Sequence, residues 1–151
     1  MTPLVSPAMF REFFAPYYKK VIGGLKAMGV RYFNIDSDGD ARLLIAELMK
    51  CGVTGIHPCE VNAGMDVEEL RKEFPAFILK GGIDKRALAR GPEAIDSELG
   101  RRMSFAWRSG RYVPYPDHGL PPDISWENVK YYAKQNLQWC ASPRGPGYAG
   151  R

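Results

Sequence analysis

Acidic and histidine side chains gather in two short polar stretches, each of which directly follows an apolar run. The stretch NIDSDGD supplies Asp36 and Asp38, and the stretch YPDHGLPPD supplies Asp117 and His118. Carboxylates and imidazoles are side chains that commonly transfer protons in enzymes near neutral pH. His118 is one of only two histidines, and three prolines stiffen its surroundings, so this turn has a defined shape. The turn serves either packing or chemistry.

Two further apolar runs also end in polar residues. His57, Cys59 and Glu60 lie at the end of one run, and a glycine pair at 81–82 precedes Asp84 at the end of another. The glycines either cradle a phosphate at a helix N-terminus or let the backbone turn while Asp84 caps the helix, and the second interpretation is favoured. Sites in parallel α/β folds are built at the carboxyl ends of the strands. The clustering therefore predicts one site at that edge.

Four short apolar runs, each followed by helix-like sequence, must position these groups. The runs cover residues 30–35, 53–58, 76–83 and 111–116, and the predicted helices cover 41–52, 66–74, 84–90, 91–110 and 125–139. Repeated strand–helix units indicate a parallel sheet, because parallel strands need crossover connections. A long helix over residues 6–29, capped by Ser6 and kinked at Pro16, precedes the first strand, and Ser125 caps the last helix.

The composition is that of one globular domain. The chain has 151 residues, 45% of them apolar, which is enough for a hydrophobic core. We expect a domain over residues 1–139 and a flexible Gly- and Pro-rich tail over 140–151. Three widely spaced cysteines and the lack of a signal-peptide pattern indicate a reducing, cytoplasmic setting. The net charge of +4 is scattered and no apolar run approaches about 20 residues, so neither a nucleic-acid partner nor a membrane is expected.

The stretch YFNIDSDGDARLL also fits two other kinds of site. An apolar strand ending in D-x-D-G resembles the first motif of haloacid dehalogenase-like phosphatases, although no later acidic pair is present to bind magnesium. Asp36, Asp38, Asp40 and Glu47 occupy positions 1, 3, 5 and 12 of a calcium loop, but Ala41 stands where that loop needs glycine. A helix cap formed by Asp38 or Asp40 explains one of the three aspartates only.

The sequence HPCE raises the question of a zinc site. His57 and Cys59 have the spacing of zinc ligands, but a structural zinc site needs four. Cys51 lies at a helix end and Cys140 near the tail, so the sequence does not complete the set. A buried cysteine that acts as a small apolar side chain is the more common case.

Several motifs in collinear order resemble the uroporphyrinogen decarboxylase superfamily. They are PLVSPAMFREFFAPYYKKVI, DSDGDARLLIAELMKCGVTGIHPCEVNAGMDVEEL, GGIDKRALARG and PDHGLPPDISWENVKYY, which together span about residues 2–135. The resemblance implies a TIM-barrel type of α/β fold. It corresponds to the C-terminal half of the family's barrel, so the chain is expected to form about half of a (β/α)8 barrel.

The resemblance also implies a role for the residues at the strand ends. His118 matches the histidine that the decarboxylases place in a GHG turn facing the acetate-bearing ring. The corrinoid-linked methyltransferases of the superfamily have a zinc-binding cysteine there and a His-x-Cys pair after an earlier strand, where this chain has Asp36 and Asp38. An Asp/Asp/His set could hold a harder metal. The loss of the zinc-ligand types favours a reaction without metal or cofactor.

The predicted function is therefore that of a uroporphyrinogen decarboxylase-like lyase of porphyrin and heme biosynthesis. The predicted catalytic residues are His118, Asp36 and Asp38, and the predicted substrate-binding residues are Glu60, Asp84 and Asp117. The substrate would be a tetrapyrrole-like small molecule. Three alternatives stay open: a corrinoid-linked methyltransferase acting on a methyl donor, a haloacid dehalogenase-like phosphatase, and an inactive fragment.

Half a barrel also implies partners. The first and last predicted strands lack the neighbours that a closed barrel would give them, and unpaired strand edges favour association with another chain. In the family, the aspartate that stabilises the cationic intermediate and the arginines that bind carboxylates belong to the first half of the barrel. We therefore expect either a homo-oligomer or pairing with a missing N-terminal half, and no activity from the isolated chain.

Overall fold

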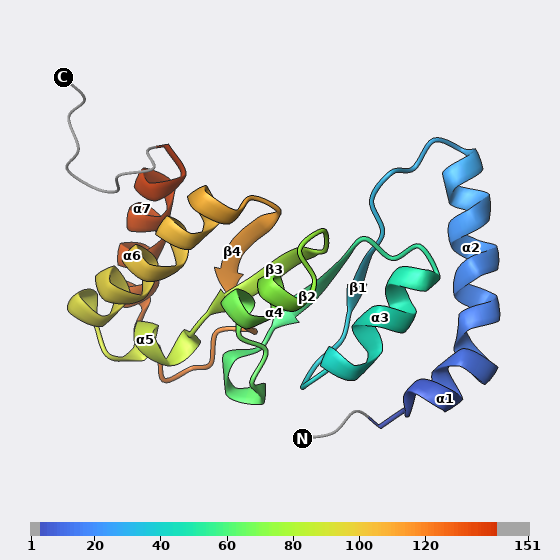
Figure 1. Ribbon diagram of the computed structural model, residues 1–151. Helices are drawn as coiled ribbons and strands as arrows, with labels where there is room; N and C mark the ends of the chain where they lie inside the picture. The colour runs from blue at the N-terminus through green and yellow to red at the C-terminus, as the bar shows by residue number, and fades with distance from the viewer. Residues whose placement is uncertain (1–3, 142–151) are drawn as a thin grey trace.

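Four strands form one parallel sheet in the order β1-β2-β3-β4 (Figure 1). A computed structural model describes residues 4–141. Its strands are β1 (Asn34–Asp36), β2 (Gly55–Cys59), β3 (Ile78–Ile83) and β4 (Tyr112–Pro116). Each strand pairs with the next one in the sequence, and helices connect them. This arrangement confirms the predicted α/β class and matches half of an eight-stranded barrel.

The helices also follow the predicted order. They are α1 (Pro7–Met9), η1 (Phe10–Phe14), α2 (Ala15–Ala27), α3 (Arg42–Lys50), η2 (Val61–Ala63), α4 (Val67–Glu73), α5 (Lys85–Ala89), α6 (Pro92–Ser109) and α7 (Trp126–Ala141). The hydroxyls of Ser6 and Ser125 accept the backbone N–H groups of Met9 and Asn128, so both predicted caps are confirmed. None of these helices is long and apolar enough to cross a membrane.

The N-terminal helix is not one kinked rod. Residues 6–29 were predicted to form a single helix bent at Pro16, whereas α1, η1 and α2 are three consecutive pieces and η1 is a π-helical turn. Pro16 lies in the first turn of α2 and has no N–H to donate to the preceding turn. The helix therefore takes a wider π-helical turn just before the proline, which is a common way for a helix to accommodate a missing backbone hydrogen bond.

One face of the sheet carries the hydrophobic core. Ile35, Ile56, Leu79 and Tyr112 are register partners across the four strands, and all belong to one apolar cluster or pack against it. Figure 1 shows α3 and α4 in front of the sheet. A second cluster, with Ile83 at its edge, joins α5, α6 and α7. Burial of the apolar side chains in these two clusters supplies the main driving force for the fold.

The opposite face of the sheet is open. Alternation along the strands places Asp36, His57, Lys80, Val113 and Tyr115 on this face, and none of them is fully buried. Val113 and Tyr115 are each 49% exposed. In a closed barrel these positions would point into the interior, so the half barrel presents its lumen-facing residues to solvent.

The glycine pair serves the backbone. Gly81 and Gly82 lie in β3 with φ values of 114° and 74°. A Cβ on Gly81 would lie 2.6 Å from the backbone nitrogen of Cys59, and a Cβ on Gly82 would lie 2.6 Å from a methyl of Val67. The carboxylate of Asp84 accepts the N–H of Arg86 and caps α5. These contacts support the turn-and-cap interpretation and not the phosphate cradle.

The C-terminal helix passes the predicted domain boundary. We expected the domain to end at residue 139, but α7 continues to Ala141. The rest of the predicted tail, residues 142–151, lies outside the described residues.

Candidate active site at the carboxyl ends of the strands

A polar pocket of about 350 Å³ lies where β1, β2 and β4 end. Its walls are formed by the side chains of Asp36, Asp38, His57 and His118, with Pro58, Tyr115 and Gly119 completing it. The three predicted catalytic residues are thus brought together from two distant parts of the sequence. Their catalytic role stays a prediction, but their proximity satisfies its first geometric requirement.

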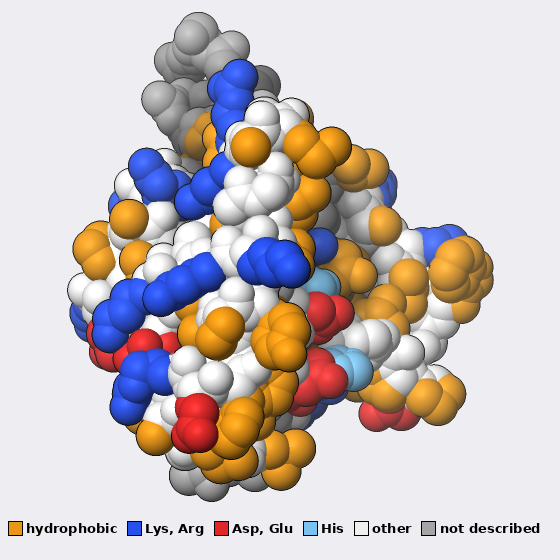
Figure 2. All heavy atoms as spheres, turned by 90° about the vertical axis from the view of Figure 1, so that its right-hand side faces the viewer, with side chains coloured by type: hydrophobic (Ala, Val, Ile, Leu, Met, Phe, Trp, Pro, Cys, Tyr) orange, Lys and Arg blue, Asp and Glu red, His pale blue; other side chains and the backbone are white. Residues whose placement is uncertain are grey.

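Each histidine in this pocket faces one aspartate. His57 Nε2 lies 3.7 Å from a carboxylate oxygen of Asp36, and His118 Nε2 lies 3.5 Å from a carboxylate oxygen of Asp38. Figure 2 shows the two histidine side chains close together, each with acidic side chains beside it. Both distances exceed those of tight hydrogen bonds, so each pair is a long polar contact that a ligand could tighten.

The tautomer of His118 follows from its second ring nitrogen. Nδ1 accepts the backbone N–H of Gly119 at 2.8 Å. Because Nδ1 is the acceptor, a neutral His118 carries its proton on Nε2, the nitrogen that faces Asp38. The turn DHG thus fixes which nitrogen can exchange a proton with the pocket.

His57 is the pocket residue that the sequence prediction missed. The sequence placed it among the polar residues at the strand ends and raised it as a possible zinc ligand with Cys59, but it was not among the predicted catalytic residues. In the sheet, His57 is the register partner of Asp36, so both side chains project from the same face. Alternation within GIHPC is the signal that could have found it, because it separates His57 from the buried Ile56.

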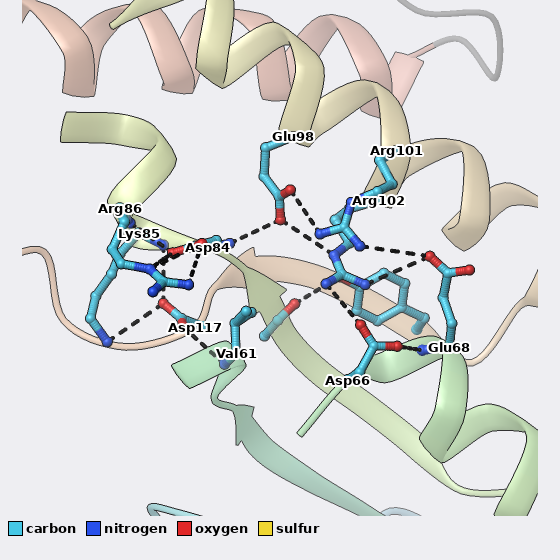
Figure 3. Close-up of polar contacts among 12 residues, drawn as sticks. Val61, Asp66, Glu68, Asp84, Lys85, Arg86, Glu98, Arg101, Arg102 and Asp117 are labelled. Carbon is cyan, nitrogen blue, oxygen red and sulfur yellow. Dashed lines mark hydrogen bonds and ion pairs between the residues drawn. The ribbon is translucent and has the colours of Figure 1, made fainter. Parts of the chain in front are cut away.

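Asp117 does not line the pocket. Its carboxylate is fully buried and accepts the backbone N–H groups of Val61 at 3.0 Å and Lys85 at 3.1 Å. The ammonium of Lys85 lies 3.6 Å from the same carboxylate (Figure 3). The predicted substrate-binding role stays a prediction; in the structure, Asp117 joins the segments that follow β2 and β3 to the end of β4. It therefore holds the backbone next to His118.

Glu60 and Asp84 also make contacts within the protein. Glu60 accepts the N–H of Gly39 at 3.2 Å and lies 3.7 Å from the ammonium of Lys85, so it braces the loop that carries Asp38. Asp84 binds Arg86 through both carboxylate oxygens. Burial raises the pKa of Asp84, but the hydrogen bonds from Arg86 outweigh it and hold the pKa below its usual value. Neither residue lines the pocket.

The thiol of Cys59 is unsuited to bind a metal. Cys59 is fully buried, and burial raises the pKa of its thiol to about 12. Metal ligation requires the thiolate. In the part of the chain that the structure describes, no group of three or more His, Cys, Asp and Glu side chains is placed to hold a metal ion. The donor set of the pocket, two carboxylates and two imidazoles, is not the sulfur-containing set of the zinc methyltransferases.

We expect the purified chain to contain clearly less than one zinc per molecule. The expectation follows from the ligand types. This pocket has Asp36, Asp38 and His118 at the positions where a tight zinc site would include a cysteine thiolate. Elemental analysis after purification without chelator measures the zinc content. One tightly held zinc per chain would contradict the expectation and favour the methyltransferase alternative.

Comparison with known proteins identifies the family. The family model for uroporphyrinogen decarboxylase (URO-D) matches residues 1–135. The chain is similar to the uroporphyrinogen decarboxylase of Chlorobaculum tepidum, with 26% identity over 125 residues. This match covers 80% of the chain and 35% of the relative. The chain thus spans about a third of the length of the curated relative that it matches.

Proposed function

The chain belongs to the uroporphyrinogen decarboxylase family, and from this membership we propose that it contributes one catalytic wall to a tetrapyrrole decarboxylase. The observation that carries the proposal is the pocket with two acid–histidine pairs at the carboxyl ends of parallel strands. That edge is where barrel enzymes place their catalytic groups. Half a barrel provides only part of such a site, so the activity belongs to this wall together with the strands that close it.

Loss of CO₂ from a pyrrole acetate requires three proton transfers, two onto carbon and one away from it. A proton adds to the pyrrole ring, the bond to the carboxylate breaks, and its electron pair flows into the cationic ring as CO₂ leaves. A second proton then reaches the exocyclic carbon, and the ring gives up the first. A site for this chemistry needs groups that deliver and remove protons at neighbouring positions.

The two pairs meet this need. His118 presents Nε2–H toward the pocket and lies next to Asp38, so we assign the delivery of the first proton to this pair. The second pair, His57 with Asp36, lies in the same pocket and is assigned the proton delivery to the exocyclic carbon, after which the first pair takes back the ring proton. Carboxylates beside the imidazoles also stabilise positive charge that develops in the ring.

The other candidate functions have less support. The pocket offers oxygen and nitrogen donors and no thiolate, which weighs against the zinc-dependent methyltransferases. A haloacid dehalogenase-like phosphatase is not supported, because the uroporphyrinogen decarboxylase family model matches residues 1–135 and that family has a barrel fold. An inactive fragment remains the alternative against which activity must be measured.

A chimera tests the proposal through His118. The chain replaces the matched segment of the Chlorobaculum tepidum relative, so that the rest of the barrel is present. We expect the chimera to decarboxylate uroporphyrinogen and His118→Gln to lower kcat about 100-fold or more, since general acid–base groups contribute on this scale. The exposed Glu127 at the start of α7 supplies a matched control, Glu127→Gln, which we expect to leave kcat unchanged.

Two outcomes would reject the assignment. One is a folded chimera, with a cooperative thermal transition, that has no turnover. The other is a His118→Gln chimera as active as its parent, which would mean that His118 only shapes the turn.

A further inference from the structure

A lysine lies on the open face of the sheet close to the candidate active site. Lys80 comes from β3, which lies between β2 and β4, and both of these strands contribute residues to the polar pocket. We propose that the ammonium of Lys80 binds a carboxylate of the substrate and holds it beside the two acid–histidine pairs. This role rests on the proposed function, since it assigns a substrate-binding group to the same site.

The register of the strands places Lys80 beside His57. Ile56 pairs with Leu79 in the core-facing row, so the residues that follow them, His57 and Lys80, are neighbours on the open face. His57 is in turn the register partner of Asp36. The row of open-face side chains that supplies one acid–histidine pair therefore continues into Lys80.

The side chain of Lys80 leans toward the pocket. Its register partner on β4 is Val113, but its ammonium lies over the ring of Tyr115, 5.2 Å from the ring centroid. Tyr115 is nearer than Val113 to the carboxyl end of β4, and it lines the polar pocket. The contact is a cation–π interaction, which restrains a long and flexible side chain without neutralising its charge. The positive charge is thus held at the edge of the pocket.

The ammonium of Lys80 has no acidic partner among residues 4–141. It makes no ion pair and no hydrogen bond to these residues, although the side chain is partly buried. Lys85 is also partly buried, but its ammonium lies 3.7 Å from a carboxylate oxygen of Glu60 and 3.6 Å from one of Asp117. A lysine that has an aromatic ring beside it and no carboxylate can complete its hydrogen bonding with an anionic ligand.

The acidic side chains of the pocket explain why a substrate carboxylate would need this lysine. Asp36 and Asp38 place their carboxylates on the pocket wall, and like charges repel one another. A carboxylate that enters the pocket is therefore disfavoured unless a cation lies close to it. Lys80 supplies that cation and leaves the two histidines free to transfer protons. It therefore selects anionic substrates and orients the ring that carries the bound carboxylate.

Binding of uroporphyrin to the full chain tests the role of Lys80 without any turnover. Uroporphyrin is the oxidised, fluorescent form of the proposed substrate and keeps all of its carboxylates. We expect Lys80→Met to raise the Kd by about tenfold or more, the scale of one lost charge-assisted hydrogen bond, and Lys80→Arg to keep it within about threefold of the parent value. Lys134→Met removes an exposed lysine on α7 and should leave the Kd unchanged. Fluorescence quenching measures the Kd of each protein.

The chimera separates this role from the catalytic one. There, Lys80→Met should raise KM about tenfold and leave kcat within about threefold, because the carboxylate is bound equally in the ground state and the transition state. A chimera without turnover would reject the proposed function, and the Kd values would still decide the role of Lys80.

Four results of the binding experiment would overturn the role of Lys80. The first is a parent chain that does not bind uroporphyrin, and the second is a Lys80→Met variant that binds it like the parent. The third is an equal loss in Lys134→Met, which would show a general attraction between charges. The fourth is Lys80→Arg binding as weakly as Lys80→Met, because the positive charge would then not be what binds.

Discussion

Replacing Arg102 by methionine is expected to lower the free energy of unfolding by about 3 kcal/mol, the low end of the range for breaking a buried ion pair from one side, because Glu98 is largely buried with Arg102 whereas Asp66 and Glu68 are 38% and 40% exposed. The Arg102 side chain is 1% exposed and extends from α6 to three acids. It lies 3.1 Å from Asp66, 3.3 Å from Glu98 and 3.8 Å from Glu68 (Figure 3). Methionine fills much of the space but leaves these carboxylates without their shared cation.

The pKa values in this cluster agree with its role. Burial lowers the pKa of Arg102, but the charges of Asp66 and Glu98 outweigh it and raise the pKa, so the guanidinium stays charged. Burial raises the pKa of Asp66, yet the N–H of Glu69 and the charge of Arg102 hold it below 3.8. The stability that Asp66 contributes is therefore present above its unfolded pKa and lost as the pH falls through its lowered folded pKa.

The adjacent arginine is the control for this measurement. Arg101 contacts Glu98 and Glu68 as well, but its side chain is 48% exposed. Arg101→Met should cost at most about 1 kcal/mol, as exposed ion pairs do. Urea unfolding of the two variants gives both values. Equal losses would show that burial of Arg102 does not make its ion pairs stronger contributors.

Replacing Asp117 by asparagine is expected to destabilise the fold by about 2 to 3 kcal/mol, since a buried hydrogen-bonding group loses its partner. The amide oxygen can accept only one of the two N–H groups, those of Val61 and Lys85, in the present geometry. The amide nitrogen would face the other N–H, donor against donor. Lys85 would also lose its closest buried anion.

The same substitution should also reach the pocket. Asp117 is bonded to the segments after β2 and β3 and directly precedes His118, so movement of its backbone shifts the imidazole relative to Asp38. In the chimera, Asp117→Asn should lower kcat for uroporphyrinogen, whereas Asp123→Asn in the exposed part of the same loop should not. An Asp117→Asn variant with parental stability in urea unfolding would contradict the structural role.

The order of elements could be predicted from the sequence because each βα unit repeats one local pattern. Apolar runs with strand periodicity and capped amphipathic helices are local patterns of a few residues, so the sequence predicts the type of each element correctly. It does not predict where each element begins and ends. The run at 30–35 yields only a short β1 over Asn34–Asp36, and the first helix contains a π-turn before Pro16. The length of β1 depends on the strand that it pairs with, and the π-turn depends on the N–H that Pro16 lacks. Hydrophobic periodicity contains neither kind of information.

The site was only partly predictable for a related reason. Asp36, Asp38 and His118 lie at or just after the ends of strands and do meet in one pocket. Asp117 follows a strand too, but its carboxylate points to backbone N–H groups of other loops. A local sequence shows that an acid lies at a strand end, but the packing of adjacent loops decides whether it faces solvent or a buried donor.

The central claim is that this chain holds a catalytic wall that acts only when the remaining strands of the barrel are present. The most direct test compares CO₂ release from uroporphyrinogen by the purified chain alone and by the chimera with the Chlorobaculum tepidum relative. We predict no release above background from the chain alone and release from the chimera that depends on His118. Turnover by the chain alone as a soluble monomer would contradict the claim.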